Sequence, residues 1–311
     1  MQGEEKMEKY ANYILHPIKI INRLASKNIL KISDKTYLKL LYKERMGKKI
    51  NLDNPQTFNE KLNWLKLNDR KDIYTTMVDK YEAKKYVADL IGEEYIIPTI
   101  GKWDKFDEID FDKLPEQFVL KCTHDSGGLS ICRSKEKFNI EEAKNKINKS
   151  LKKNYYYASR EWPYKNVKPR IIAEPYLENQ KDKGLIDYKF FCFNGVPKFL
   201  YISEGLENHE TASISFLDMD FKRARFKRKD YREYKEIPKK PLNFEKMKEL
   251  SEILSNGMTF LRVDFYEIKG KILFSELTFY PCSGFIPFEP EEYDKIIGDM
   301  LILPEIAKGE K

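Results

Sequence analysis

The chain has 311 residues, of which 41% are hydrophobic and 14% aromatic, and its 57 Lys and Arg against 50 Asp and Glu give a net charge of +7. This length is enough to bury a substantial core, in one two-lobed unit or in two domains. The four cysteines have no metal-ligand spacing and the three histidines are scattered, which argues against a zinc site and for reduced thiols in a cytoplasmic protein. Nothing in the sequence resembles a secretory signal or a membrane span.

The chain divides into three stretches by its secondary-structure signals. Residues 1–75 have few strand signals and predict a helical N-terminal region. Residues 76–177 mix helix and strand, and residues 178–311 contain hairpins and one clear helix over about 243–255. The basic segment 18–32 has helical apolar spacing, which suits either packing against the core or lying on a membrane.

A lysine strand and a glycine loop occupy residues 118–132, FVLKCTHDSGGLSIC. A short apolar strand carries Lys121, and a small polar loop with Ser126, Gly127 and Gly128 precedes a second strand. Such a loop can bring backbone N–H groups up to phosphate oxygens, with the lysine ammonium beside them. By itself the pattern favours a tight hairpin turn with a surface lysine, because it is neither a P-loop nor a dinucleotide fingerprint.

Two further strand patterns follow. Residues 170–177, RIIAEPYL, predict an apolar strand that ends near Glu174, because the next residue is a proline and cannot donate to a sheet. A linker between two lobes is expected there. Residues 187–203 predict a hairpin around an Asn-Gly turn, and its first strand places Lys189 on a definable face.

Residues 222–240 are strongly basic and include aromatic side chains. A charge run of this kind is usually a solvated loop or linker. The functional alternatives are a site for an anionic acceptor, such as a sugar nucleotide, or contact with an acidic membrane surface. Nucleic acid is not expected, because no DNA- or RNA-binding module accompanies the segment.

The most informative pattern is a β-hairpin at residues 258–280, which gathers two carboxylates on one polar face. The expected register places Glu276 opposite Arg262 and diagonal to Asp264, close enough for both carboxylates to hold one divalent cation. The alternative is that this face is the solvent-exposed side of an edge hairpin and carries an arginine-carboxylate pair.

This register depends on the length of the hairpin loop. Gly270 is expected at the third position of a three-residue loop, so that Glu267 pairs with Lys271. A two-residue loop would instead send the two carboxylates to opposite faces. The return strand is expected to keep its apolar residues on one parity: Leu273, Leu277 and Phe279.

Seven strings in fixed order resemble the TupA-like ATP-grasp proteins, named for teichuronopeptide biosynthesis: NPQTFNEKLNWLKLNDR, VDKYEAKKYV, LPEQFVLKCTHDSGG, IIAEPYL, DYKFFCFNG, RVDFYEI and FSELTFYPCSG. The resemblance runs from about residue 35 to about residue 290. It implies an α+β fold of the ATP-grasp type, in which two α+β lobes clasp a nucleotide. Residues 76–177 would be the small lobe and residues 178–311 the large lobe.

The resemblance also implies the site residues. ATP would meet the lysine strand, the loop over the phosphates and the interlobe hinge, which contacts adenine through backbone groups and the ribose through a side chain: Lys121, Ser126, Gly127, Gly128, Glu174, Tyr176 and Leu177. Mg²⁺ would be held by Asp264, Glu276 and Thr278. The threonine stands where many ATP-grasp enzymes carry asparagine, and its reach is shorter. Lys189 and Arg262 would face the triphosphate and act in catalysis.

The function that the resemblance implies is an ATP- and Mg²⁺-dependent ligase that joins a carboxylate to an amine through an acyl phosphate. The expected substrate is an anionic small molecule or a sugar-linked compound, in the modification of a bacterial surface or capsular polysaccharide or its sugar precursor. Two alternatives stay open: a kinase or other transferase acting on a sugar, and a nucleotide-binding scaffold of a membrane-associated polysaccharide assembly. The expected location is the cytoplasm, with peripheral contact to the inner face of the membrane.

Overall fold

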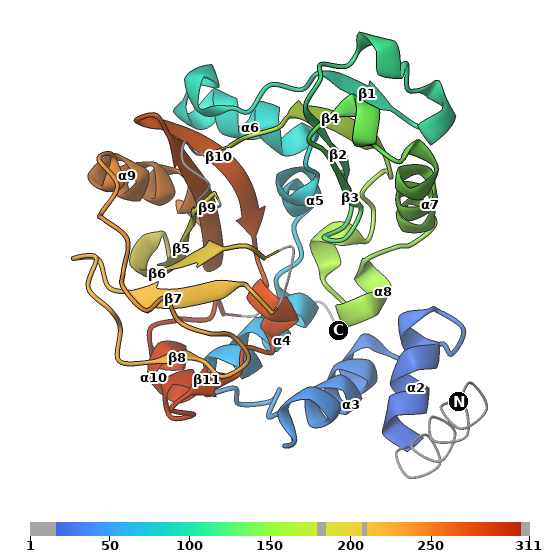
Figure 1. Cartoon of the computed structure of the whole chain (residues 1–311). Coiled ribbons are helices and arrows are strands. Elements are labelled where there is room, and N and C mark those ends of the chain that lie inside the picture. Colours follow the sequence, from blue (N-terminus) through green and yellow to red (C-terminus); the bar gives the residue numbers. More distant parts are fainter. Residues whose placement is uncertain (1–16, 179–184, 207–209, 306–311) are drawn as a thin grey trace.

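The computed structural model describes residues 17–178, 185–206 and 210–305 (Figure 1). The α-helices are α2 (Pro17–Ser26), α3 (Asp34–Met46), α4 (Phe58–Asn68), α5 (Ile73–Val78), α6 (Glu82–Ile91), α7 (Ile140–Leu151), α8 (Tyr156–Ser159), α9 (Phe244–Ser255) and α10 (Tyr293–Asp299). The β-strands are β1 (Gly101–Trp103), β2 (Phe118–Cys122), β3 (Leu129–Cys132), β4 (Ile171–Pro175), β5 (Asp187–Phe193), β6 (Val196–Glu204), β7 (Ser213–Leu217), β8 (Lys227–Arg228), β9 (Phe260–Ile268), β10 (Lys271–Thr278) and β11 (Phe288–Glu289). Two short 3-10 helices matter below, η5 (Trp162–Tyr164) and η6 (Pro281–Gly284).

The small sheet is antiparallel, with the strand order β1-β4-β2-β3, and α7 packs against β2 and β3. It has a core of its own, to which the sheet contributes Phe118, Leu120 and Ile171 and the helix Ile147. Because side chains alternate along a strand, Lys121 points to the face of β2 opposite to Leu120. The lysine therefore stands outside this core.

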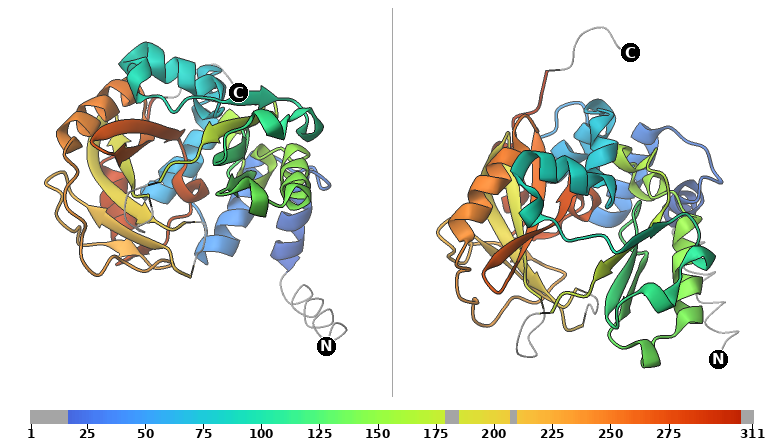
Figure 2. Two further views of the ribbon diagram at one scale, coloured as in Figure 1. Left: turned by 45° about the horizontal axis from the view of Figure 1, so that its top comes forward. Right: turned by 90° about the horizontal axis from the view of Figure 1, so that it is seen from above.

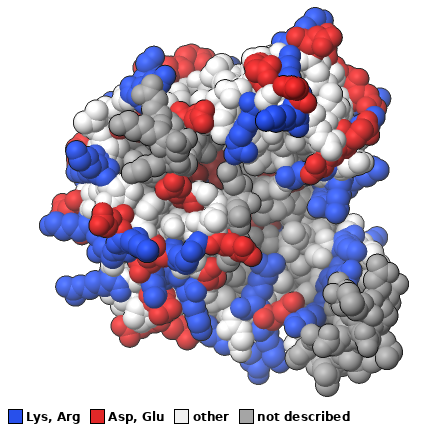
Figure 3. All heavy atoms as spheres, viewed as in Figure 1, with Lys and Arg blue, Asp and Glu red and all other residues white. Residues whose placement is uncertain are grey.

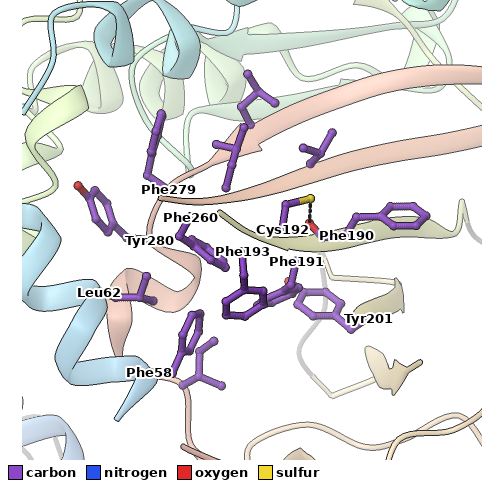
Figure 4. Packing of buried hydrophobic residues seen from close by; sticks show 14 of the residues in the cluster. Phe58, Leu62, Phe190, Phe191, Cys192, Phe193, Tyr201, Phe260, Phe279 and Tyr280 are labelled. Atoms are coloured by element: carbon purple, nitrogen blue, oxygen red, sulfur yellow. Dashed lines mark hydrogen bonds between the residues drawn. The ribbon is translucent and has the colours of Figure 1, made fainter. Parts of the chain in front are cut away.

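The large sheet is antiparallel, with the order β10-β9-β5-β6-β7, and lies beside the small sheet in the views of Figure 2. Helix α9 covers one face, where the ring centroids of Phe244 and Phe190 are 5.6 Å apart. Helix α4 covers part of the other face and packs Phe58 against Phe191, Phe193 and Phe260 (Figure 4). The ring centroids of Phe58 and Phe260 are 5.1 Å apart, in an edge-on contact that is favourable for aromatic pairs.

This second face of the large sheet changes character along β5. Phe191 and Phe193 lie under α4 and are fully buried or nearly so. Asp187 and Lys189 have the same parity but stand at the start of the strand, where they line a cavity. One sheet face thus holds both an aromatic core and a row of charged side chains.

The α+β fold class expected from the sequence is confirmed. The turn between β5 and β6 is Asn194-Gly195, with φ angles of 48° and 83° that suit a type I′ hairpin. Residues 17–68 contain α2, α3 and α4, and residues 1–16 of the expected helical region lie outside the described residues. No helix in the described part of the chain is both long and apolar enough to cross a membrane.

Candidate active site

Two adjoining cavities lie between the sheets, where Figure 3 shows a hollow between the two halves of the molecule. The smaller has a volume of about 300 Å³, and its lining includes Lys80, Gly127, Gly128, Tyr164, Lys189 and Glu276. The larger has a volume of about 530 Å³, and its lining includes Tyr176, Leu177 and Ser203. The two cavities share Lys121, Ser126, Glu174 and Asp187. Nine of the expected site residues therefore line this cleft, and Arg262, Asp264 and Thr278 contact the lining residues Lys189 and Glu276 from within the large sheet.

The loop of the carboxylate hairpin differs from the expectation. Ile268 pairs with Lys271, so the loop has two residues, Lys269 and Gly270, and Glu267 pairs one residue further along the return strand. The φ angles of 51° and 73° at the two loop residues are those of a type I′ turn, whose twist matches that of the flanking strands. The predicted three-residue loop was wrong because glycine suits both loop types.

A β-bulge at Ser275 nevertheless keeps the two carboxylates on one face. Phe274 pairs with Phe265, and the next paired residue is Glu276, directly opposite Asp264. One extra residue in the return strand restores the parity that the two-residue loop would have reversed. The carboxylates are therefore direct cross-strand neighbours rather than the expected diagonal ones.

The bulge also changes which apolar residues of β10 are buried. Ile272 and Phe274 are 5% and 4% exposed before the bulge, and Leu277 and Phe279 are buried after it. Leu273, expected to share the face of Leu277, is only partly buried. Its expected place was wrong because the parity shifts at the bulge.

Asp264 stands at the centre of a buried charge network. Its side chain is fully buried, and its Oδ2 accepts a hydrogen bond from Lys189 Nζ at 2.6 Å. Arg262 donates to both of its oxygens, from Nε at 2.7 Å and from Nη2 at 2.6 Å. Charge-assisted, bidentate contacts of this kind are among the strongest in proteins. They hold both cations at the floor of the cleft.

Glu276 and Thr278 complete the metal candidates. Glu276 Oε1 accepts a hydrogen bond from Arg262 Nη2 at 2.8 Å, and Thr278 Oγ1 accepts one from the same nitrogen at 3.0 Å. Burial opposes ionisation of Glu276, but the charges of Lys189 and Arg262 outweigh it and lower the pKa of this carboxyl to about 2. Glu276 is therefore an anion at neutral pH.

Asp264 and Glu276 suit a magnesium ion that takes its remaining ligands from a phosphate and from water. Mg²⁺ prefers carboxylate, phosphate and water oxygens, and Asp264 and Glu276 supply two carboxylates from facing strands. Within the described residues, no group of three or more His, Cys, Asp or Glu side chains could hold a metal ion. Phosphate and water oxygens would have to complete the coordination.

Asp187 is a site residue that we did not predict from the sequence. Its Oδ2 lies 3.0 Å from Lys189 Nζ, and its Oδ1 is buried without a hydrogen-bond partner. Burial raises its pKa to about 6, although Lys189 acts in the opposite direction. The signal was present, because Asp187 and Lys189 share one face of the predicted strand.

Glu174, expected in the hinge that contacts ATP, is instead a buried carboxylate paired with two lysines. It is buried in β4, and its two oxygens lie 2.5 Å from Lys121 Nζ and 2.6 Å from Lys84 Nζ. Burial favours the neutral acid, but the two lysines outweigh it and lower its pKa. Glu174 thus holds a pair of cations at the cleft, and no sequence signal distinguished Lys84 from other helix lysines.

The glycine loop between β2 and β3 is held from inside. Asp125 accepts hydrogen bonds from the backbone N–H of Gly128 and from the hydroxyl of Ser150, while Lys80 donates to the Asp125 carbonyl. A Cβ at Gly128 would lie 2.6 Å from the side chains of Cys122 and Ser150, so only glycine fits there. Lys80 belongs to the turn between α5 and α6.

The chain is similar to one protein family over most of its length and, more distantly, to several solved structures. The family model TupA-like ATPgrasp matches residues 60–302. No curated protein matches the chain. Among solved structures, it resembles D-alanine–D-alanine ligases from Bacillus anthracis, in complex with ATP, and from Helicobacter pylori, each at 15% identity and with TM-scores of 0.40 and 0.41.

These structural matches are partial. They cover 73% and 79% of this chain and 63% and 69% of the two ligases, respectively. VanG D-Ala:D-Ser ligase from Enterococcus faecalis is similar at 14% identity and a TM-score of 0.37, over 65% of this chain and 52% of that one. The family model, in contrast, covers most of the chain and includes every residue of the candidate site. The protein belongs to the TupA-like ATP-grasp family.

Proposed function

We propose that this protein is an ATP- and Mg²⁺-dependent ligase that joins a carboxylate to an amine. One observation carries the proposal: in a member of an ATP-grasp family, Lys121 of the small sheet lines the same cleft as Lys189 and Glu276 of the large sheet. Arg262 and Asp264 lie directly behind these two residues and contact them. Fixed cations and a bound metal are what phosphoryl transfer requires, because its transition state is stabilised mainly by charge and position.

In this proposal, ATP lies across both cavities. The larger cavity, lined by Tyr176 and Leu177, takes the base and ribose. Lys121 and the glycine loop at residues 126–128 meet the phosphates in the smaller cavity. The carboxylate pair holds Mg²⁺, with Thr278 beside it, and the bound ion would neutralise phosphate charge.

The proposed reaction has two steps. An oxygen of the substrate carboxylate attacks the γ-phosphorus of ATP, and the bond to ADP breaks to give an acyl phosphate. The amine then attacks the acyl carbon, loses a proton and displaces inorganic phosphate, which leaves an amide. Lys189 and Arg262 stabilise the negative charge, and Asp187 and Asp264 hold them in place before substrate binds.

The fate of the γ-phosphate tests this reaction. Hydroxylamine in place of the amine, with ATP, Mg²⁺ and glucuronate or galacturonate as carboxylate probes, is expected to give a hydroxamate and one inorganic phosphate for each hydroxamate. Colorimetric hydroxamate and phosphate assays measure both products, and omission of the carboxylate is the control. A stable phosphorylated sugar without free phosphate would favour the sugar kinase, and ATP binding without turnover would favour the scaffold.

We further propose that the acceptor is a polysaccharide or a sugar precursor in the cytoplasm. The support is the likeness to a family named for teichuronopeptide biosynthesis and the basic surface around β7 and β8, where Lys and Arg gather in Figure 3. Part of that charge is paired, since Arg223 lies 2.8 Å from Glu233 and Arg228 lies 2.6 Å from Asp230. An anionic sugar suits the remaining excess of positive charge.

Peripheral membrane contact is part of this proposal and rests on α2 and the turn after it. Ile20, Leu24 and Ile29 are 37%, 36% and 67% exposed, and Lys19 and Lys27 lie beside them. An exposed apolar face with basic neighbours is typical of helices that lie on anionic bilayers. We expect the protein to sediment with phosphatidylglycerol vesicles, and Ile20→Ser with Leu24→Ser to remove it from the pellet. Equal sedimentation of the double variant would contradict this contact.

A further inference from the structure

The segment that follows the carboxylate hairpin has an unusual backbone. Loop 279–286 begins directly after β10 and contains η6. Cys282, Ser283 and Gly284 have φ angles of 50°, 54° and 69°, so three consecutive residues lie in the left-handed region. Only the glycine adopts this conformation readily, and such strain persists where the surroundings over-determine it. The residues that contact this loop must therefore hold it in this backbone conformation.

A polar stripe on α4 contacts the backbone of this loop. Asn59 and Asn63 are fully buried and lie one turn apart on the same helix face. The amide of Asn59 donates to the Ile286 carbonyl at 2.9 Å and accepts from the Ile286 N–H at 2.7 Å. Asn63 Nδ2 donates to the Gly284 carbonyl at 2.8 Å. Two asparagines thus hold the loop in place through hydrogen bonds to its main chain.

Lys66 continues the same stripe and is also fully buried. Its ammonium donates to the carbonyls of Ser283 at 2.7 Å and Ser159 at 2.9 Å, and lies 4.9 Å from the centre of the Phe285 ring. Glu161 accepts hydrogen bonds from the hydroxyls of the same two serines, at 2.7 Å and 2.8 Å. A buried lysine and a buried carboxyl group therefore tie the loop to the segment before η5.

Other contacts of the loop connect it to residues near the cleft. The thiol of Cys282 lies 2.7 Å from Nη1 of Arg228, which belongs to the basic residues 222–240. The segment that Glu161 and Lys66 tie to the loop contains Tyr155, whose hydroxyl accepts from Ser126 of the glycine loop at 3.2 Å. The ring of Tyr155 also meets that of Tyr164, which lines the smaller cavity. The segment that contains Tyr155 and Glu161 thus links the loop to the glycine loop and to Tyr164 in the lining of the smaller cavity.

We propose that Asn59, Asn63 and Lys66 are positioning residues, which hold loop 279–286 as the wall against which a carboxylate substrate is oriented. This inference rests on the proposed ligase function. A carboxylate that attacks the γ-phosphorus must approach from the end of the cleft away from the base. Loop 279–286 follows directly after Glu276 and Thr278, which we place at that end with the metal ion. Lys189 and Arg262, which the carboxylates hold at the floor of the cleft, suit an anionic substrate.

Cys282 provides a direct readout of the loop. It is partly exposed, whereas Cys122, Cys132 and Cys192 are buried. Burial raises the pKa of its thiol, although Arg228 opposes the shift, so labelling of the native protein by N-ethylmaleimide is expected to be slow. In Asn63→Ala and Lys66→Met the loop loses an anchor, and labelling at Cys282 is expected to be at least about tenfold faster. Peptide mass spectrometry assigns the labelled residue.

Asn68→Ala is the matched control, because the Asn68 amide donates to the Trp64 carbonyl of its own helix. Its labelling rate is expected to equal that of the wild-type chain. Lys66→Met keeps the side-chain volume and removes the buried amine, so it is the variant to use if Asn63→Ala does not fold. Unchanged labelling of Cys282 in a folded variant would overturn the positioning role.

The nucleotide response separates this role from general destabilisation. ATP with Mg²⁺ is expected to raise the melting temperature of Asn63→Ala and Lys66→Met by as much as that of the wild-type chain. In the hydroxamate assay, their KM for the uronate probe is expected to rise at least about tenfold, while KM for ATP stays within about twofold. Loss of the ATP response in these variants alone would overturn the inference. No ATP response in the wild-type chain would instead overturn the proposed function.

Discussion

Asp264→Asn is expected to reduce ATP turnover at least about 100-fold and to lower the free energy of unfolding by about 3 kcal/mol. The carboxylate is fully buried and bonded to Lys189 and Arg262. A neutral amide would leave these cations with less compensating charge, which is costly in a buried site. The same change removes one of the two carboxylates that would hold Mg²⁺.

Glu276→Gln is the matched comparison. Its side chain is 38% exposed and has one contact with Arg262, at 2.8 Å, so water can compensate for the lost charge. We expect this variant to lose turnover with a change in unfolding free energy below about 1 kcal/mol. Urea unfolding and phosphate release measure the two quantities. Wild-type turnover in Asp264→Asn would show that the metal site lies elsewhere.

Phe58→Ala is expected to lower the free energy of unfolding by about 3–5 kcal/mol. Phe58 is fully buried, and its ring contacts those of Phe191, Phe193 and Phe260 of the large sheet (Figure 4). Removal of the ring leaves a cavity that these rigid side chains cannot fill. Helix α4 is therefore expected to unfold together with the large sheet.

Ile29→Ala serves as the control for this prediction. Ile29 is 67% exposed, and its truncation is expected to change the unfolding free energy by less than about 0.5 kcal/mol. Chemical denaturation followed by far-ultraviolet circular dichroism measures both variants. A separate early transition in Phe58→Ala, with the remaining protein as stable as before, would mean that α4 is not part of this core.

Much of the candidate site could be predicted because its signals are local. Alternation along a strand decides which side chains share a face, and this pattern by itself predicts the strands that carry Lys121, Lys189 and Asp264. The Asn194-Gly195 turn was similarly readable, since few residue pairs accept positive φ at both positions. The order of several such strings led to the family, which the match over residues 60–302 confirms.

The pairing of side chains across the cleft was not readable in this way. Nothing local distinguishes Lys84 from its neighbour Lys85, yet one holds Glu174 and the other lies on the surface beside Asp89. The polar stripe on α4 is ambiguous for the same reason, because Asn63 would suit a solvated helix face equally well. Glu174, which contacts Lys84, and Gly284, which contacts Asn63, are more than 80 residues away from them in the chain, and only packing brings these pairs together.

The carboxylate hairpin separates what the local sequence determines from what tertiary packing decides. By itself the sequence determined that Asp264 and Glu276 belong to two strands joined by a turn at Gly270, since apolar alternation and glycine act over a few residues. Only the tertiary structure decided the register, because a bulge at Ser275 depends on how both sides of it pack. Ile272 and Phe274 fill the core before the bulge, and Leu277 and Phe279 fill it after, so burying both pairs forces the extra residue out of the ladder and turns Glu276 towards Asp264.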